Sequence, residues 1–299
     1  MSTYSIKDLE QLSGIKAHTL RVWEQRYQLI TPKRTETNIR FYDDDDLKLI
    51  LNIALLRDND HKISKIASMT QAEMHEEIWR LTEKTLRYPN QIHVLTLAMI
   101  NLDEVRFEKV LTSNVHKLGF ENTMVNVIYP FLSKIGVLWQ TGAINPAQEH
   151  FVANLIRQKL IVAIDNIPLS SYAYSNKYLL YLPEGELHEI TLLFMHYLIK
   201  VRGDRVLYFG QNLPFSDLQS VYNVHHPDFI VTVITTSPSS HEVQAYVDRL
   251  GRSFPDATIL LSGYQVIGQD LRLPYRARIL MGIGQVTDFI EEHQMVKSA

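Results

Sequence analysis

Residues 178–191, Tyr178-Leu-Leu-Tyr-Leu-Pro-Glu-Gly-Glu-Leu-His188-Glu-Ile-Thr191, decide how the second half of the chain folds. The first five form a short apolar run suited to a buried strand, and the proline and glycine that follow mark its end. From the isoleucine onward, apolar residues recur at helical spacing. His188 is therefore expected in a strand-to-helix loop, which is where open α/β sheets bind ligands.

The pattern Glu186-x-His188-x-x-Thr191 resembles the Asp/Glu-x-His-x-x-Gly motif of cobalamin-binding Rossmann-like domains. The resemblance implies that His188 is the lower axial ligand of cobalt and that Glu186 orients its ring, the usual arrangement around a metal-bound histidine. Thr191 departs from the glycine of that motif. A solvated loop histidine is the ordinary alternative, because a short pattern with one mismatch recurs by chance.

Composition bounds what the chain can be. Its 299 residues suffice for two or three domains, and 45% hydrophobic residues exclude a disordered chain. No apolar run approaches the roughly 18 residues of a membrane span, and the first residues do not form a secretory signal, so we expect a soluble, cytoplasmic protein. The absence of cysteine excludes disulfides and thiolate sites, which leaves histidine and carboxylates as the strong candidate metal ligands.

The N-terminal segment carries the pattern of a DNA-binding element. The formal net charge of -3 gives no general indication of nucleic-acid binding, but residues 16–42 hold six Lys or Arg against two acids. Two helical patterns, Ser5 to Leu12 and Ile15 to Tyr27, are separated by Gly14. They predict a helix-turn-helix whose second helix enters the major groove.

This block resembles the DNA-binding domain of the MerR family of transcription regulators. The matching residues are Ile6, Leu9, Gly14, Ile15, Thr19-Leu-Arg-Xaa-Trp-Glu, Arg26-Tyr27, Pro32, Arg34 and Arg40-Xaa-Tyr42. The resemblance implies a winged helix-turn-helix with residues 34–42 as the wing. The candidate DNA-binding residues are Lys16, His18, Thr19, Arg21, Arg26, Tyr27, Arg34, Arg40 and Tyr42. The alternative is that the arginines are merely solvated surface.

Separate helical patterns follow, at 73–86, 91–100, 103–117, 120–138 and 146–164. An ordinary MerR regulator would continue into one long coiled-coil helix, whereas the last four of these segments predict a four-helix bundle.

Near the end of the predicted bundle, Trp139 and Glu149-His150 are separated by nine residues. They resemble the Trp-x9-Glu-His motif with which cobalamin-sensing MerR regulators, including photoreceptor members, cover the upper face of the corrin. The resemblance implies an indole lid, with Glu149 and His150 offering hydrogen bonds above cobalt. The alternative is a tryptophan packed at a helix end beside a solvated turn. Photoreceptor members place histidine where this chain has Gln140, and because an amide is a poor cobalt ligand, a stable bis-histidine state in the light is not expected.

After residue 176, strand and helix patterns alternate. Strands are expected at 178–182, 205–210, 229–235, 258–262 and 278–281, each followed by a helix that is short after the fourth strand. Five such units predict a parallel, doubly wound sheet of the Rossmann-like, flavodoxin-like class.

Two further positions match landmarks of the cobalamin-binding family. Its hydroxyl-bearing loop after the third strand corresponds to Thr235 and Ser237, and its Gly-Gly after the fourth strand corresponds to Ser262-Gly263. Thr191 and Ser262 add atoms to the slot that would take the displaced benzimidazole tail. Overpacking of roughly 1 to 3 kcal/mol would weaken binding by about one to two orders of magnitude.

The sequence thus predicts three domains: a winged helix-turn-helix at 1–72, a helical linker and bundle at 73–168, and a Rossmann-like domain at 176–299. The resemblances imply a sequence-specific, DNA-binding transcription regulator, an expected homo-oligomer (dimer or tetramer) and no enzyme. Its activity would be controlled by adenosylcobalamin or methylcobalamin between bundle and Rossmann-like domain.

Two alternatives remain. In one, a MerR-type regulator has a degenerate cobalamin domain that senses a partner protein or another small molecule. The other, a corrinoid methyl carrier, does not explain the N-terminal pattern.

Overall fold

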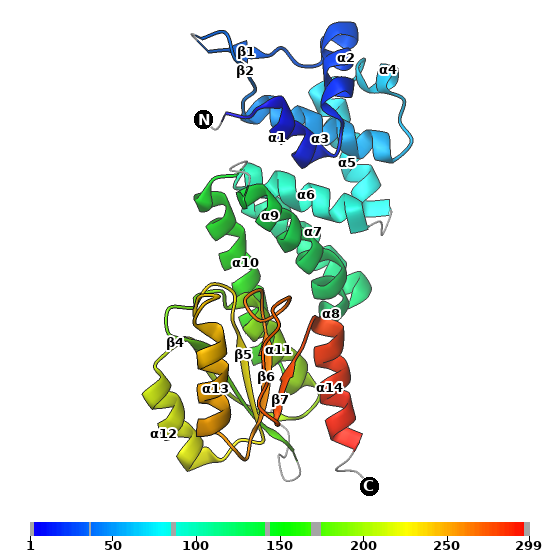
Figure 1. The fold of residues 1–299 in the computed structure, drawn as a ribbon. Coiled ribbons are helices and arrows are strands. Elements are labelled where there is room, and N and C mark those ends of the chain that lie inside the picture. The colour runs from blue at the N-terminus through cyan, green and yellow to red at the C-terminus, as the bar shows by residue number, and fades with distance from the viewer. Residues whose placement is uncertain (1–2, 36, 85–87, 141–143, 169–174, 296–299) are drawn as a thin grey trace. The chain divides into compact units, whose positions relative to one another are not determined.

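The computed structural model describes residues 3–35, 37–84, 88–140, 144–168 and 175–295, and of residues 75, 79, 82–84, 137–140 and 295 the backbone alone. The chain divides into two compact units, Met1–Leu155 and Ile156–Ala299 (Figure 1). The first unit contains helices and a two-stranded ribbon, and the second contains a five-stranded sheet with helices. The three domain boundaries expected from the sequence stay a prediction.

The helix-turn-helix forms where capping residues predict it. Ser5 caps α1 (Ile6–Ser13) in a capping box with Asp8, and Gly14 ends the helix in the left-handed conformation at φ 72°. The second helix, α2 (Ala17–Tyr27), buries Leu20 and Trp23. These two apolar contacts hold α2 in place while its other faces remain at the surface.

The wing is a short antiparallel ribbon. Lys33 and Arg34 of β1 (Lys33–Arg34) pair with Phe41 and Arg40 of β2 (Arg40–Phe41). A backbone bridge joins Tyr4 to Tyr42 directly after the ribbon. The predicted winged helix-turn-helix is therefore confirmed.

The helix that follows the wing begins at an acidic run, residues 43–46. Asp43 forms a capping box with Asp46 at the start of α3 (Asp44–Asp58). The next two helices are α4 (Ile63–Ile66) and α5 (Gln71–Lys84).

A helical region follows, as predicted. It comprises α6 (Tyr88–Ile100), α7 (Glu104–Leu118), α8 (Phe120–Thr123), the π-helical turn η1 (Met124–Ile128), α9 (Tyr129–Gln140) and α10 (Pro146–Asp165). The helix predicted at 120–138 thus contains a π-helical turn that its apolar spacing does not indicate. The central helix, α6, packs against α3, α7, η1 and α9.

The second unit is a parallel sheet with the order β4-β3-β5-β6-β7. Its strands are β3 (Lys177–Pro183), β4 (Arg205–Leu213), β5 (Phe229–Val233), β6 (Thr258–Ser262) and β7 (Ala277–Ile279), and every neighbouring pair is parallel. Residues 178–183 of β3 are all buried, as expected for a central strand covered on both faces. The strand order reverses between β3 and β5, so the carboxyl ends of these two strands flank the usual ligand crevice.

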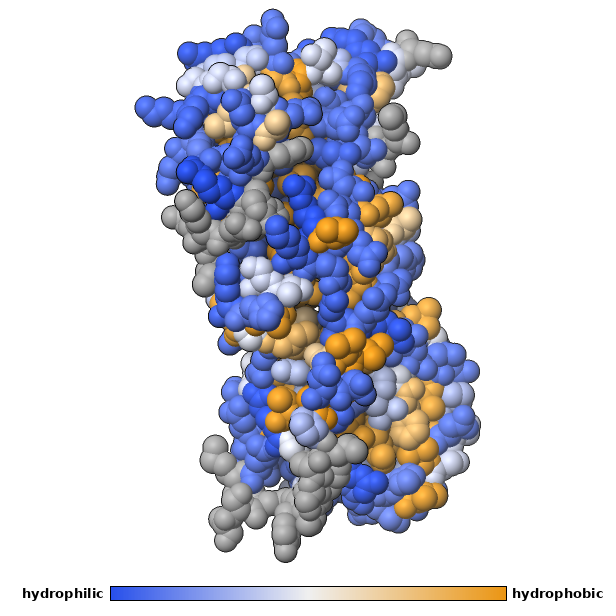
Figure 2. Space-filling view, turned by 180° about the vertical axis from the view of Figure 1, so that it is seen from behind, coloured by the Kyte–Doolittle hydropathy of each residue, from blue (hydrophilic) through white to orange (hydrophobic). Residues whose placement is uncertain are grey.

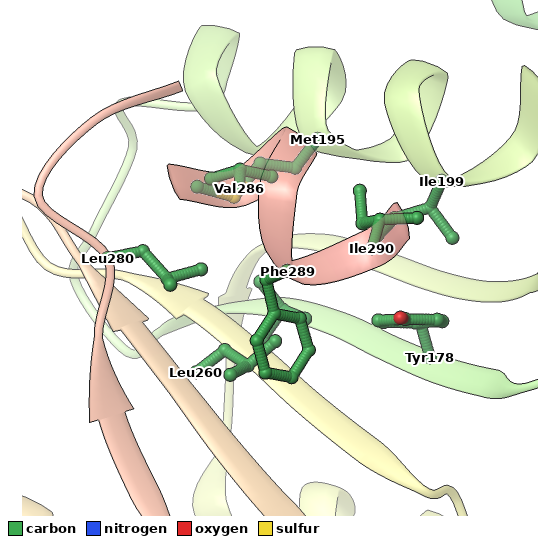
Figure 3. Close-up of a pocket in the computed structure, with 9 residues that line it drawn as sticks. Tyr178, Met195, Ile199, Leu260, Leu280, Val286, Phe289 and Ile290 are labelled. Carbon is green, nitrogen blue, oxygen red and sulfur yellow. The ribbon is translucent and has the colours of Figure 1, made fainter. Parts of the chain in front are cut away.

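Helices cover both faces of the sheet. One face packs against α12 (Phe215–His225) and α13 (Val243–Ser253) through a core that includes Leu179, Leu218 and Val247. The helices α11 (Ile190–Val201) and α14 (Ile283–Met295) supply residues that meet Tyr178 and Leu260 of the sheet (Figure 3). The doubly wound class predicted from the sequence is confirmed.

One predicted element is wrong. Residues 264–268 after β6 form turns instead of the expected short helix. Gly263 and Gly268, on either side of the turns, adopt φ values of +101° and +87°. Helical backbone cannot continue through positive φ.

A buried histidine should make the first unit sensitive to acid. Burial and, to a smaller extent, the charge of Lys134 on α9 lower the pKa of His93 on α6 to about 3. Unfolded histidine takes up a proton near pH 6.5, so the folded state should lose roughly 1.4 kcal/mol per pH unit below about 6.5. We expect His93→Leu to remove this loss.

Thermal melts of wild type and His93→Leu between about pH 7 and pH 5 measure the effect. His116→Leu, which replaces an exposed histidine of α7, is the control and should keep the wild-type dependence. Equal acid sensitivity in wild type and His93→Leu would assign the loss to other groups.

Candidate cobalt-ligand site and DNA-binding surface

A buried carboxylate joins the loops that follow β3 and β5. The side chain of Glu186 is fully buried, and its Oε1 accepts hydrogen bonds from the backbone N–H groups of Leu187 at 2.9 Å and His188 at 3.0 Å. Its Oε2 accepts three more, from the N–H groups of Thr235 at 2.8 Å, Thr236 at 2.6 Å and Ser237 at 3.2 Å. Both loops are therefore fixed to one anion.

The hydrogen bonds keep Glu186 ionised. Burial alone would raise the pKa of its carboxyl, but the hydrogen bonds from His188 and from the N–H groups of Thr235 and Thr236 outweigh burial and hold this pKa well below its usual range. The loop after β3 therefore carries a permanent negative charge at neutral pH.

His188 is oriented by that charge. Its Nδ1 lies 2.6 Å from Glu186 Oε1. Because an ionised carboxylate only accepts, Nδ1 carries the proton, and Nε2 is the nitrogen whose lone pair can bind a metal. The His188 side chain remains 58% exposed. Orientation of one ring nitrogen by a carboxylate is the arrangement found behind metal-bound histidines.

The sequence did not indicate a second buried carboxylate beside His188. Glu189, 7% exposed, accepts hydrogen bonds from Arg157 Nε on α10 at 2.7 Å and from the Tyr208 hydroxyl on β4 at 2.8 Å. The ring of His196 stacks on Tyr208 with centroids 5.1 Å apart. The residue next to the candidate ligand is thus anchored to both α10 and β4.

The loop after β6 approaches β5 closely. A Cβ atom on Gly263 would lie 2.4 Å from the Ile234 carbonyl oxygen, so only glycine fits there. Ser262 is buried and donates its hydroxyl to the Leu280 carbonyl oxygen at 2.9 Å. Thr191 lies half-buried in the first turn of α11.

A small apolar cavity lies between the sheet and helices α11 and α14 (Figure 3). Its walls include Tyr178, Met195, Leu260 and Phe289, and its volume of about 10 Å³ holds about one water molecule. The Tyr178 hydroxyl is buried without a hydrogen-bond partner among the described residues, and burial raises its pKa. Such a hydroxyl costs stability until a polar group reaches it.

The residues expected over the upper face of a corrin belong to the first unit. Trp139 and Gln140 lie in the last turn of α9, and their side chains are outside the described residues. Glu149 and His150 lie in the first turn of α10, with His150 Nδ1 3.6 Å from Glu149 Oε2. A site shared with His188 stays a prediction.

Most DNA-binding candidates are exposed. His18, Arg21 and Arg26 project from α2, Lys16 precedes it, Arg34 and Arg40 lie on the ribbon, and Thr19 and Tyr27 are half-buried. Arg40 Nη2 lies 4.0 Å from Glu24 Oε1, and this ion pair joins the wing to α2. On the face that Figure 2 shows, most of the surface of the DNA-binding part is hydrophilic.

Tyr42 departs from its predicted place at this surface. It is fully buried, because its backbone pairs with that of Tyr4 and draws its ring into the core. Its side chain therefore supports the base of the wing from inside.

Known proteins match both parts of the chain. Residues 4–73 match the MerR HTH family regulatory protein model, and residues 91–163 match the B12 binding domain model. The chain is 27% identical to the HTH-type transcriptional repressor CarH of Myxococcus xanthus over 271 residues, 85% of this chain and 86% of that protein. It is 25% identical to the repressor CarA of the same organism over 263 residues, 87% and 86% of the two chains.

Two further known proteins are each similar to only part of this chain. The chain is 30% identical to the HTH-type transcriptional regulator ZntR homolog of Haemophilus influenzae over 112 residues, 36% of this chain and 82% of that protein. The monomethylamine corrinoid protein of Methanosarcina barkeri superposes with a TM-score of 0.55 at 11% identity, covering 67% of this chain and 96% of that one. At that identity the likeness concerns the fold alone.

A winged helix-turn-helix followed by a helical region and a parallel-sheet domain is the layout of a transcription regulator with a B12-binding domain. The chain belongs to the MerR family of transcription regulators and carries a B12-binding domain. No helix in the described ranges combines the length and apolar composition needed to cross a membrane.

The buried Glu186 carboxylate should stabilise the second unit in a pH-dependent way. Glu186→Gln leaves buried N–H donors less well paired, which should cost roughly 1 to 3 kcal/mol at neutral pH. The folded pKa lies below the unfolded value of 4.5, so this stabilisation is complete above pH 4.5 and shrinks as the pH falls further. Urea unfolding of both proteins over that pH range measures it.

Glu184→Gln, an exposed change in the same loop, is the control and should match wild type. A Glu186→Gln penalty that is constant with pH would contradict the role of the charge.

Proposed function

We propose that this transcription regulator binds DNA through α2 and the wing, and binds a corrinoid through His188. The observation that carries the cofactor proposal is the Glu186–His188 pair at 2.6 Å, because it presents one histidine nitrogen, correctly protonated, at the carboxyl edge of a doubly wound sheet. We propose no enzymatic activity.

The residues around His188 fit a large, flat, apolar group that brings a metal with it. Leu187 after β3, Tyr264 after β6 and Met281 after β7 are 62%, 79% and 57% exposed. Exposed apolar side chains gathered at one edge favour a binding surface. A corrin ring would cover such an edge, and cobalt, which carries its own equatorial nitrogens, needs only one lower ligand from the protein.

The apolar cavity and the Tyr178 hydroxyl suit the nucleotide tail of cobalamin. The hydroxyl needs a polar partner, and the surrounding side chains of Met195 and Phe289 would have to move, because the cavity holds only about 10 Å³. This small volume supports the expectation that a crowded slot weakens binding, but neither Thr191 nor Ser262 lines the cavity.

The cofactor form and the signal belong to the same proposal. When bound, adenosylcobalamin supplies a cobalt–carbon bond that light can break. Trp139, Glu149 and His150 are the candidates for its upper face. We propose that a change of upper ligand alters assembly of a homo-oligomer and thereby the affinity for an operator.

A second candidate function is favoured by the near-closure of the cavity. In it the chain is a MerR-type regulator whose sheet domain has lost cobalamin and senses a partner protein or another small molecule. Purification with adenosylcobalamin in the dark separates the two, since retained corrin absorption supports the first and its absence supports the second.

The cofactor proposal predicts that His188→Ala retains much less cobalamin. Its side chain is largely exposed, so the fold should survive its removal. Corrin absorption after gel filtration measures retention, and circular dichroism checks the fold. His225→Ala, at the end of α12, removes an exposed histidine elsewhere in the same domain and should retain wild-type amounts.

Equal retention by wild type and His188→Ala would reject His188 as the cobalt ligand while leaving cobalamin binding intact. Absence of cobalamin from both would favour the second candidate function.

For the DNA-binding surface, Arg40→Ala should weaken binding to a duplex obtained by in vitro selection. If Arg40 contacts a phosphate, the slope of log affinity against log salt concentration should fall by about one. Arg57→Ala, an arginine in the last turn of α3 that pairs with Asp58, is the matched control and should keep affinity and slope. An unchanged slope for Arg40→Ala would remove Arg40 from the interface.

A further inference from the structure

A second cavity lies entirely within the first unit, between α3 of the DNA-binding part and helices α5, α6 and α7. Its volume of about 350 Å³ falls in the range of roughly 300 to 1,000 Å³ that is typical of small-molecule sites. None of its lining residues belongs to the Glu186–His188 site. It requires an explanation of its own.

The cavity wall contains a buried amide. Asn52 of α3 is 7% exposed, and its Oδ1 has no hydrogen-bond partner among the described residues. Leaving a buried acceptor unpaired costs roughly 1 to 3 kcal/mol. Asn52 lines the cavity, and because its Oδ1 is itself covered, a turn of the amide would let a ligand with an N–H or O–H group satisfy it there.

The charged side chains that line the cavity do not all pair with one another, and one positive charge remains. Lys48 and Asp45 pair with each other at 3.3 Å across one turn of α3. Arg106, in the first turn of α7, makes no side-chain ion pair within the described part of the chain. The amino end of α7 is already capped by the Asp103 carboxylate, which accepts from the Arg106 backbone N–H at 2.9 Å, so the positive position is the Arg106 guanidinium. An anionic group fits beside Arg106.

The remaining wall is apolar. Leu49 of α3, Met74 of α5 and Leu97 of α6 line the same cavity. Together with Asn52 and Arg106 they define three requirements for a ligand: an apolar body, a hydrogen-bond donor and an anion.

We propose that this cavity binds a small carboxylic acid that carries an apolar chain and an amide or hydroxyl donor. Such a ligand would contact α3 and the helices of the helical region at once. Its binding would fix the DNA-binding part against α5, α6 and α7 without involving the corrinoid.

The test uses the full-length protein and three related probes. N-acetylleucine carries all three features, N-acetylleucinamide lacks the carboxylate, and 4-methylpentanoate lacks the donor. Calorimetry or ligand-observed NMR gives the dissociation constants. N-acetylleucine should bind at least about tenfold more tightly than either of the others.

Two variants locate the binding. Asn52→Leu and Arg106→Gln should each weaken N-acetylleucine binding by roughly tenfold. Asn52→Leu should also melt at or above the wild-type temperature, because it removes an unpaired buried amide. Lys109→Gln, one turn further along α7 and outside the cavity lining, loses the same charge and should bind as wild type does.

The proposal is overturned if N-acetylleucine does not bind up to its solubility limit, or if all three probes bind equally. Unchanged affinity in Arg106→Gln also overturns it, and that variant decides the matter should Asn52→Leu fail to fold.

Discussion

The ligand edge of the sheet domain depends on one buried anion. The strand order reverses between β3 and β5, and the loops that follow these two strands direct backbone N–H groups toward one point. Glu186 accepts hydrogen bonds from N–H groups of both loops and from the ring of His188. Because one carboxylate sets loop conformation, ring orientation and tautomer together, the candidate ligand is positioned before any cofactor arrives.

Local signals predicted most of the fold. Gly14 and the apolar strand runs placed element ends within a few residues, since capping and burial act over one or two turns. The turns after β6 escaped prediction, because the clash that requires Gly263 is with the distant carbonyl of Ile234. The π-helical turn at 124–128 has no local signal in the apolar spacing.

In the candidate site, too, the sequence predicts contacts between residues that are close in the chain and misses contacts between distant ones. Glu186 and His188 are two residues apart, so a sequence motif can specify their contact. Glu189 meets Arg157 and Tyr208 across separations of 32 and 19 residues, which no spacing rule indicates. Tyr42 was misplaced for the same reason: the burial of its side chain goes with backbone pairing to Tyr4, 38 residues earlier in the chain.

Regulation of the proposed kind requires connections from the sheet domain to α2 and the wing. In the second unit, Arg157 of α10 holds Glu189, the neighbour of the candidate ligand. In the first unit, the same helix contributes Gln148, which donates to a carbonyl of α6. From α6, Asn90 exchanges amide hydrogen bonds of 3.0 and 3.2 Å with Asn59 at the end of α3. Directional polar contacts tolerate little displacement before they break, so under the proposed function these links would carry a shift of α10 as far as α3.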